Sequence, residues 1–334
     1  GYTAHALKSY AGFTGRMWLG TAKTLTVEDI AVTGTSFDAT VDAANKKITA
    51  TVFETDAIEN PALVIAVGGC MMAQQHRQDD IKFRYPYVDF VMGPSSLHRL
   101  PQLLAQKLKT GKRIYCPEEA EYTVVEDLPI RRESTYRAWV SVMYGCNNFC
   151  SYCIVPYVRG RERRRKKEDV IAEFSELVKA GYKDITLLGQ NVNSYRYTSV
   201  DDTGNEHTVN FPELLRTIAQ LVPDMRIRFT TSHPKDMSDE TLQVIAQHTN
   251  LCKFIHLPVQ SGSNRILKLM NRKYTREWYL DRIAAIRRIL PDAAISTDVF
   301  CGFHSETIEE HQETLSLMRE VGFDSAFMFK YSER

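Results

Sequence analysis

The sequence has almost no net charge and no long apolar segment. Its 334 residues carry a formal net charge of +1, so overall electrostatics does not indicate a nucleic-acid partner. A membrane-spanning helix needs about 18 consecutive apolar residues, and the longest apolar run, 62–73, is interrupted by Gly68 and Gly69. No charged and then apolar leader opens the chain. We therefore expect a cytoplasmic protein without a membrane partner.

Cysteine is scarce and unevenly distributed. There are seven cysteines, none of them in residues 1–69, and three fall within residues 146–153. A secreted disulfide framework uses paired cysteines spread along a short chain, so an odd and crowded set is untypical of it. The distribution favours metal-ligating thiols in a reducing compartment.

The first third of the chain divides into two predicted parts. Residues 1–61 are rich in Thr, Ala and Asp, and two Thr-bearing runs at 37–41 and 47–52 predict a β-hairpin. We treat 1–61 as an atypical β-rich leader. Residues 62–130 predict part of an α/β domain, with strands at 62–67 and 88–92 and a helix at 97–108. The charged stretch 109–136 is the best candidate linker.

Residues 131–334 predict a third domain in which strands and amphipathic helices alternate. This alternation predicts βαβ crossovers, hence an α/β fold with a parallel sheet and helices outside. Six strands make a partial (β/α)6 barrel, whose functional residues lie at the carboxyl ends of the strands. The strands are predicted at 138–144, 184–188, 226–230, 253–257, 294–300 and 325–329. The helices are predicted at 167–180, 212–221, 238–247, 276–289 and 308–321, with a shorter turn at 264–270.

Three cysteines follow the first barrel strand at C-x₃-C-x₂-C spacing. Cys146, Cys150 and Cys153 lie on one loop, and thiolates are the ligands of iron–sulfur clusters. In a four-iron cluster, three cysteines leave one iron open. The alternative is a structural zinc site, which needs four ligands, usually from two C-x₂-C pairs. No second pair follows at a matching distance, so the spacing favours the open cluster.

These residues carry a family resemblance. The Cys-x₃-Cys-x-aromatic-Cys pattern, with Tyr152 as the aromatic residue, is the signature of the radical S-adenosylmethionine (SAM) enzymes. Residues 146–163 resemble the methylthiotransferases, most closely the MiaB-type tRNA methylthiotransferases. The likeness covers about 62–334, and the further stretches that carry it are 188–195, 231–234, 256–263 and 270–275.

The resemblance implies a radical SAM core over 131–334. In the family, Cys146, Cys150 and Cys153 hold a [4Fe–4S] cluster whose open iron chelates SAM, and polar residues at the strand ends contact SAM or the substrate. Read from the residues alone, each such polar residue is equally a cap or turn residue. The predicted contacts are Gln190, Asn191, Ser232, Gln260 and Asp298.

The resemblance also implies a second [4Fe–4S] cluster, held by three cysteines of an N-terminal α/β domain. Cys70 matches the last of the three, so residues 62–130 are identified as a truncated remnant of that domain. The other two cysteines have no counterpart in residues 1–69. The family continues past Arg334 into a small RNA-binding β-barrel, so we expect reduced affinity for tRNA.

The implied activity is methylthiolation of C2 of N6-isopentenyladenosine at position 37 of tRNA. The implied partners are the tRNA anticodon arm and an electron donor such as flavodoxin or ferredoxin. A basic run at 159–167 is either a solvated face or a contact for RNA phosphates. Two alternatives remain: another methylthiolation target, namely threonylcarbamoyladenosine or a ribosomal protein, or a catalytically incomplete RNA-binding relative.

Overall fold

The chain divides into two compact units in the computed structural model. One unit comprises residues 1–123 with 157–159, and the other 124–156 with 160–334. None of the helices in the described part of the chain is long and apolar enough to cross a membrane. The structure describes five N-terminal strands, Thr3–Leu7 (β1), Arg16–Gly20 (β2), Lys23–Glu28 (β3), Ala39–Asp42 (β4) and Lys47–Val52 (β5), and residues 64–116, 124–126, 130, 132, 134–201 and 203–332.

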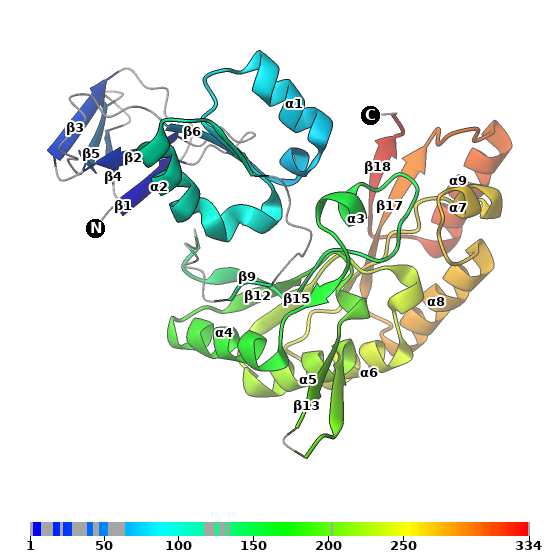
Figure 1. Ribbon diagram of the computed structural model, residues 1–334. Coiled ribbons are helices and arrows are strands. Elements are labelled where there is room, and N and C mark those ends of the chain that lie inside the picture. The colour runs from blue at the N-terminus through cyan, green and yellow to red at the C-terminus, as the bar shows by residue number, and fades with distance from the viewer. Residues whose placement is uncertain are drawn as a thin grey trace. The chain divides into compact units, whose positions relative to one another are not determined.

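The first unit is built on a five-stranded sheet in the order β1-β2-β6-β7-β8 (Figure 1). Strands β6 (Val64–Gly68), β7 (Phe90–Met92) and β8 (Ile114–Cys116) are parallel, and β2 joins β6 antiparallel. A separate sheet has the order β3-β5-β4, in which β4 pairs antiparallel with β5. The helices are α1 (Gln75–Arg84) and α2 (Leu100–Thr110), with 3₁₀ turns at Cys70–Ala73 and Pro94–Arg99.

The core of this unit lies on both faces of the parallel strands. Side chains alternate along a strand, so Phe90 packs with Leu103 and Leu104 of α2, whereas Val91 packs on the other face with Met72. The predicted linker at 109–136 is wrong at Ile114–Cys116, which pairs with β7. A three-residue strand directly after the charged pair Lys112 and Arg113 is too short to show a period in the sequence.

The described part of the second unit contains six parallel strands, as predicted. They form two three-stranded sheets in the orders β9-β12-β15 and β16-β17-β18, connected by a parallel bridge between Ile227 and Leu251. This arrangement confirms the α/β fold class and the partial barrel. The strands are β9 (Arg137–Ser141), β12 (Asp184–Leu188), β15 (Arg226–Phe229), β16 (Phe254–His256), β17 (Ala294–Cys301) and β18 (Ser325–Lys330).

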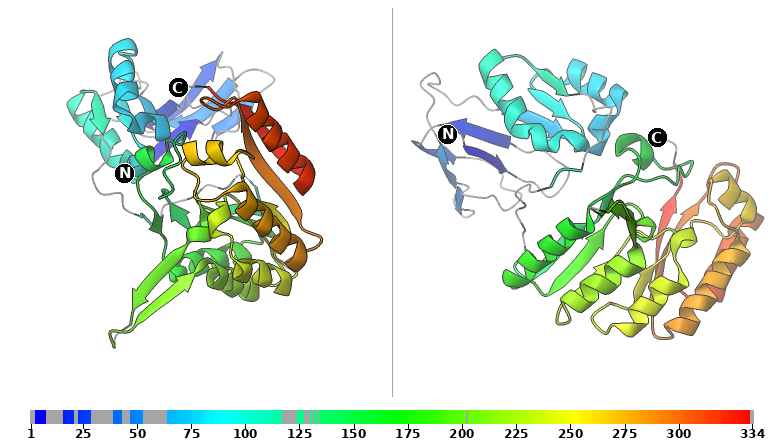
Figure 2. Two further views of the ribbon diagram at one scale, coloured as in Figure 1. Left: turned by 90° about the vertical axis from the view of Figure 1, so that its right-hand side faces the viewer. Right: turned by 60° about the horizontal axis from the view of Figure 1, so that its bottom comes forward.

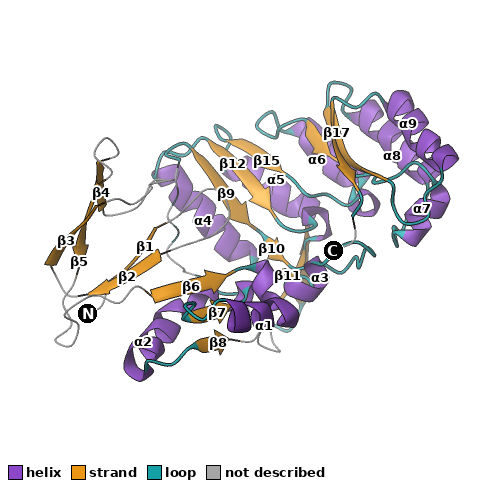
Figure 3. Ribbon diagram, turned by 90° about the horizontal axis from the view of Figure 1, so that it is seen from above, coloured by secondary structure: helices purple, strands orange, loops and turns teal. Residues whose placement is uncertain are grey.

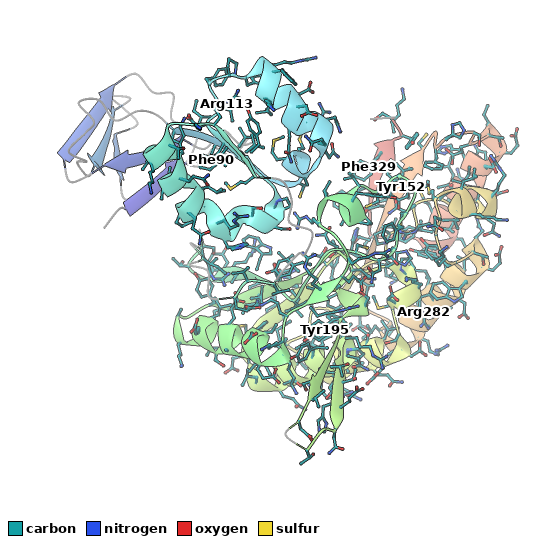
Figure 4. All side chains as sticks on the ribbon, in the orientation of Figure 1. Phe90, Arg113, Tyr152, Tyr195, Arg282 and Phe329 are labelled. Atoms are coloured by element: carbon teal, nitrogen blue, oxygen red, sulfur yellow. The ribbon has the colours of Figure 1, made fainter. Side chains whose placement is uncertain are left out.

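Helices cover the outer side of these strands (Figures 2 and 3). Ile185 and Leu187 of β12 are fully buried in one apolar core with Phe174 of α4 and Leu215 of α5. Tyr195, labelled in Figure 4, belongs to the same core, and its hydroxyl donates to the carbonyl of Arg165 at 2.9 Å. The helices are α4 (Lys167–Lys179), α5 (Phe211–Leu221), α6 (Asp239–Gln247), α7 (Asn264–Leu269), α8 (Arg276–Ile289) and α9 (Ile308–Val321).

Two local features of this unit were not predicted. The expected strand 138–144 is broken at Val142 into β9 and β10 (Met143–Tyr144), and β10 pairs with β11 (Arg163–Arg164). A hairpin of β13 (Arg196–Val200) and β14 (Glu206–Asn210) projects from the unit (Figure 1). Shorter turns are α3 (Val155–Val158) and 3₁₀ turns at Val192–Ser194 and Pro234–Asp236.

Candidate functional site

The loop with the three cysteines begins at Gly145, directly after β10. Gly145 has φ +72°, in the left-handed region that favours glycine. A Cβ atom there would lie 2.2 Å from the carbonyl oxygen of Arg161. The next residue, Cys146, donates its backbone N–H to the carbonyl of Gly160 at 3.2 Å. Because the two chain segments approach so closely, only glycine fits at the start of the loop.

The far part of the loop is fixed by the residues around α7 and β17. The side-chain amide of Asn271 donates to the carbonyl of Phe149 at 2.8 Å, which holds Phe149 at φ +49°. The ring of Tyr152 packs edge-on against Phe300, with the ring centroids 4.9 Å apart. Phe300 also contacts Phe329 of β18, with the ring centroids 6.0 Å apart, and Figure 4 labels both Tyr152 and Phe329. The aromatic residue of the motif therefore anchors the loop to the sheet.

The three thiols are sheltered and two of them accept hydrogen bonds. Cys146 and Cys150 are buried and Cys153 is half-buried. The Sγ atom of Cys146 accepts from both the backbone and the side-chain N–H of Asn148 at 3.5 Å, and that of Cys150 accepts from Arg272 at 3.4 Å. Burial raises the pKa of the Cys146 and Cys153 thiols. N–H donors aimed at sulfur are the groups that stabilise thiolates bound to a cluster.

The residues of the loop supply the donor set of an iron–sulfur cluster. Across the described residues, no group of three His, Cys, Asp or Glu side chains is placed to hold a single metal ion. The three cysteines lie within eight residues of one loop, and thiolates are the ligands of iron–sulfur clusters. The buried thiols and their donors therefore fit a [4Fe–4S] cluster.

The structure places Gln190 and Asn191 directly after β12. Gln190 is half-buried. Asn191 is buried, and its amide is used within the protein: Nδ2 donates to Asp236 at 2.6 Å, and Oδ1 accepts the backbone N–H of His233 at 3.0 Å. In this structure Asn191 fixes the turn that follows β15. Contact of either residue with SAM stays a prediction.

Two further predicted residues, Ser232 and Gln260, follow the ends of β15 and β16. Asp298 was predicted to end the fifth strand but lies inside β17, because that strand continues to Cys301. The buried hydroxyl of Ser232 has no hydrogen-bond partner among the described residues, so it is available to a ligand. Gln260 is buried at φ +73°, with its backbone bonded on both sides to β17. The Asp298 carboxylate lies 3.5 Å from Nε2 of His256, whose Nδ1 is 2.9 Å from the Ser296 hydroxyl. Their roles as SAM contacts stay predictions.

Two residues beside this site had no role assigned from the sequence. His256 of β16 is opposite Ser296 in β17 and lies 3.5 Å from the carboxylate of Asp298, two residues further along that strand. Arg272 reaches Cys150 from a position 122 residues away. Its place in the Met-Asn-Arg-Lys-Tyr-Thr stretch was the only signal, and that stretch does not indicate a direction for the side chain.

The basic run is partly engaged within the unit. Arg165 is buried and pairs with Glu126 at 2.6 Å and with Glu173 at 2.5 Å. Arg164 pairs with Glu162 at 2.6 Å. The guanidinium of Arg165 is held in a buried pair and is not free to meet a phosphate, whereas the side chain of Arg164 is 28% exposed. Arg165 holds the 124–126 segment in place through Glu126, and contact of the basic run with RNA phosphates stays a prediction.

His233, in the turn after β15, gives a prediction about pH. Burial, with Arg272 and Lys235 adding to it, lowers the pKa of His233 to about 2. The unfolded chain then takes up a proton below about pH 6.5 that the folded chain does not, so folding stability falls as pH falls. We expect His233→Gln to remove up to about 1.4 kcal/mol of this loss per pH unit between pH 5.5 and 3.5. Urea unfolding of both proteins across this range measures the slope, and equal slopes would contradict the assignment.

Cys70 lies in the first unit. It begins the 3₁₀ turn Cys70–Ala73 after β6, next to Gly69 at φ +117°, and is half-buried. Because no cysteine occurs in residues 1–69, two of the three ligands that the second cluster needs are missing from this chain. The residues present do not fit that cluster, and the role of Cys70 as a ligand stays a prediction.

Known proteins resemble this chain over most of its length. A curated relative from Parabacteroides distasonis, named tRNA-2-methylthio-N(6)-dimethylallyladenosine synthase, is 56% identical over 283 residues, which cover 84% of this chain and 60% of the relative. Relatives with the same name from Porphyromonas gingivalis (53% over 273 residues; 81% and 57% covered) and Clostridium perfringens (51% over 276 residues; 83% and 60% covered) also match. The chain thus spans about three-fifths of the length of these relatives.

A solved structure and a family profile agree with the fold. The structure of the cobalamin-dependent SAM radical enzyme OxsB with aqua-cobalamin and SAM bound matches with a TM-score of 0.50 at 16% identity. It covers 76% of this chain and 39% of that one. At this identity the likeness bears on the fold alone. The profile of the Radical SAM superfamily matches residues 140–318, which include the cysteine loop and the strands up to β17. The chain belongs to the radical SAM superfamily, whose members use a [4Fe–4S] cluster and SAM.

Proposed function

We propose that this chain is the radical SAM part of a tRNA methylthiotransferase acting on N6-isopentenyladenosine at position 37. The observation that carries the proposal is the 51–58% identity to relatives so named. An alignment of 283 residues in a chain of 334 necessarily includes positions 146–153, so the likeness includes the cysteine loop. The proposed partners are the tRNA anticodon arm and a flavodoxin- or ferredoxin-type donor in the cytoplasm.

The residues of the loop would hold the cluster. Cys146, Cys150 and Cys153 would each ligate one iron, leaving the fourth iron for the amino and carboxylate groups of SAM. When bound, the [4Fe–4S] cluster supplies the electron that cleaves SAM and starts radical chemistry. The buried Ser232 hydroxyl, after β15, and the Asp298 carboxylate, within β17, would orient polar groups of SAM or substrate.

The sulfur-inserting half of the reaction has no ligand set in this chain. Cys70 is the one cysteine that matches the second cluster, and residues 1–69 supply no other. We therefore derive no step through that cluster. The expected iron content after anaerobic reconstitution is about four per chain rather than about eight.

Hydrogen abstraction from the substrate tests this function without requiring sulfur insertion. The reconstituted chain is mixed with SAM, a reductant and an anticodon stem-loop whose N6-isopentenyladenosine carries deuterium at C2. We expect about four irons per chain, formation of 5′-deoxyadenosine, and deuterium in that product by mass spectrometry. The matched control is the same stem-loop with deuterium at C8, which should give unlabelled product.

Other outcomes distinguish the alternatives. If the isopentenyladenosine substrate gives 5′-deoxyadenosine without deuterium, but a threonylcarbamoyladenosine substrate labelled at C2 gives deuterated product, then threonylcarbamoyladenosine is the substrate. Cleavage of SAM that neither RNA stimulates would point to a protein target. Folded protein that binds no iron and cleaves no SAM would contradict the proposed function.

A further inference from the structure

A guanidinium lies buried against the cysteine loop. Arg272 follows α7 and is 9% exposed. Its backbone N–H donates to the carbonyl of Leu267 at 2.9 Å, and the preceding Asn271 has φ +57°, so the chain turns sharply there and directs the side chain inward. Arginine keeps its charge in proteins, including at buried positions. The site thus contains a fixed positive charge.

The contacts of this guanidinium leave its charge uncompensated. Nη1 donates to Sγ of Cys150 at 3.4 Å and to the hydroxyl of Tyr152 at 3.5 Å. Nη2 donates to the carbonyl of Pro258 at 2.9 Å, and Nε to the hydroxyl of Tyr274 at 2.8 Å. None of these acceptors is a carboxylate. None of the carboxylates in the described part of the chain forms an ion pair with Arg272.

A buried charge without a counter-ion is costly, and proteins rarely retain one. Arg165, the other arginine that is buried in the described part of this unit, is paired with both Glu126 and Glu173. Arg272 contacts the one thiol of Cys150 where Arg165 has two carboxylates. Once thiolates bind iron they become negatively charged, and a [4Fe–4S] cluster on three of them is net negative and becomes more so on reduction. A cluster bound to Cys150 would supply negative charge next to this guanidinium.

We propose that Arg272 is the counter-ion of the [4Fe–4S] cluster and that its charge raises the reduction potential of that cluster. The positive charge stabilises the reduced state more than the oxidised one, because the reduced state carries one more negative charge. Low local dielectric around the buried guanidinium strengthens this effect. The inference rests on the cluster named in the proposed function and is independent of the RNA target.

The neighbouring lysine supplies a matched control. Lys273 carries the same charge one residue further along but is exposed, with its amine 2.6 Å from Oδ1 of Asn271. Arg272→Met removes the buried charge while roughly keeping the volume, and Lys273→Met removes a solvated charge. Arg272→Lys keeps the charge but not the planar fork of donors. Arg272→Gln keeps polarity without charge.

The measurement is a potentiometric titration of the reconstituted cluster without SAM or RNA. The electron paramagnetic resonance signal of the reduced state reports the fraction of reduced cluster at each potential. At a fixed solution potential we expect Arg272→Met and Arg272→Gln to lower the ratio of reduced to oxidised cluster at least tenfold. For one electron this equals a shift of about 59 mV to more negative potential. Arg272→Lys and Lys273→Met should stay within about threefold of the unchanged protein, or about 28 mV by the same conversion.

The iron content and the potential of the variants together test the role of Arg272. An unchanged ratio in Arg272→Met, in protein with the full iron content, would overturn it. If neither neutral variant assembles a cluster, the result for Arg272→Lys is used. A cluster with the original potential in Arg272→Lys would show that the positive charge is what the cluster requires. Loss of the cluster in Arg272→Lys as well would show that only the shape of the arginine matters, and would overturn the inference. The unchanged protein is measured first, so absence of iron there counts against the proposed function instead.

Discussion

Replacing Cys150 with serine should lower the iron content of the reconstituted chain from about four per chain to below one. Formation of 5′-deoxyadenosine from SAM should fall at least a thousandfold, to the level without protein. The reason is that three thiolates are the minimum set for a cluster with one open iron. Cys150 is buried in the middle of the loop and accepts from Arg272, so no other side chain can take its place.

Other cysteines of the same unit provide controls for this prediction. Cys301 is exposed at the end of β17 and Cys252 is half-buried, and neither lies on the loop. Cys301→Ser and Cys252→Ser should keep the full iron content and SAM cleavage. Iron and sulfide counting together with the visible absorption of the cluster measure all three variants. Retention of four irons in Cys150→Ser would mean that a different ligand set holds the cluster.

The barrel was predictable because its elements carry strong local signals. Predicted and observed bounds coincide for α8 and α9. The N-terminus of α8 is capped by the Thr275 hydroxyl, and that of α9 by a capping box of Thr307 with Glu310, both of which can be recognised in a sequence. The buried parallel strands are short apolar runs of the kind that periodicity detects, such as β12, where Ile185 and Leu187 are fully buried.

The elements that were missed lack such a signal. The strands β13 and β14 are exposed along most of their length, and only Tyr197 and Val209, which pair across the hairpin, pack against the core. Their sequence therefore shows no sustained alternation of apolar and polar residues. The hairpin is instead organised by Asp201, whose carboxylate accepts from the backbone of Thr203 and Asn205 at 2.9 Å. The break at Val142 arises because β10 turns to pair with β11, a partner twenty residues away.

The ligand loop was predictable, but its surroundings were not. Cysteine spacing identifies the ligands because the cluster requires neighbouring thiols on one loop. The donors to those thiols come from elsewhere: the contact of Arg272 with Cys150 joins positions 122 apart, and only the fold brings them together. The same holds for Arg165, which the charge pattern of the basic run places on the surface and the structure places between Glu126 and Glu173.

Gly145→Ala is expected to be the most destabilising single substitution at the site. Two costs combine: a residue with a Cβ atom in the left-handed region loses about 1–2 kcal/mol, and a Cβ atom 2.2 Å from the carbonyl oxygen of Arg161 forces the two segments apart. Overpacking typically adds about 1–3 kcal/mol. The free energy of unfolding in urea should therefore fall by about 3 kcal/mol. Displacement of Cys146, the next residue, should also reduce iron binding at least fivefold.

The control for this substitution separates backbone strain from close contact. Gly204 lies in the turn of the β13–β14 hairpin at φ +85°, but a Cβ atom there meets no atom within 4 Å. Gly204→Ala should therefore cost only about 1 kcal/mol and leave iron binding unchanged. A difference of about 2 kcal/mol between the two variants measures the contact with the segment at Gly160 and Arg161. Equal losses would show that the loop yields to the added methyl group, and that its position depends on the anchors at Asn271 and Tyr152 instead.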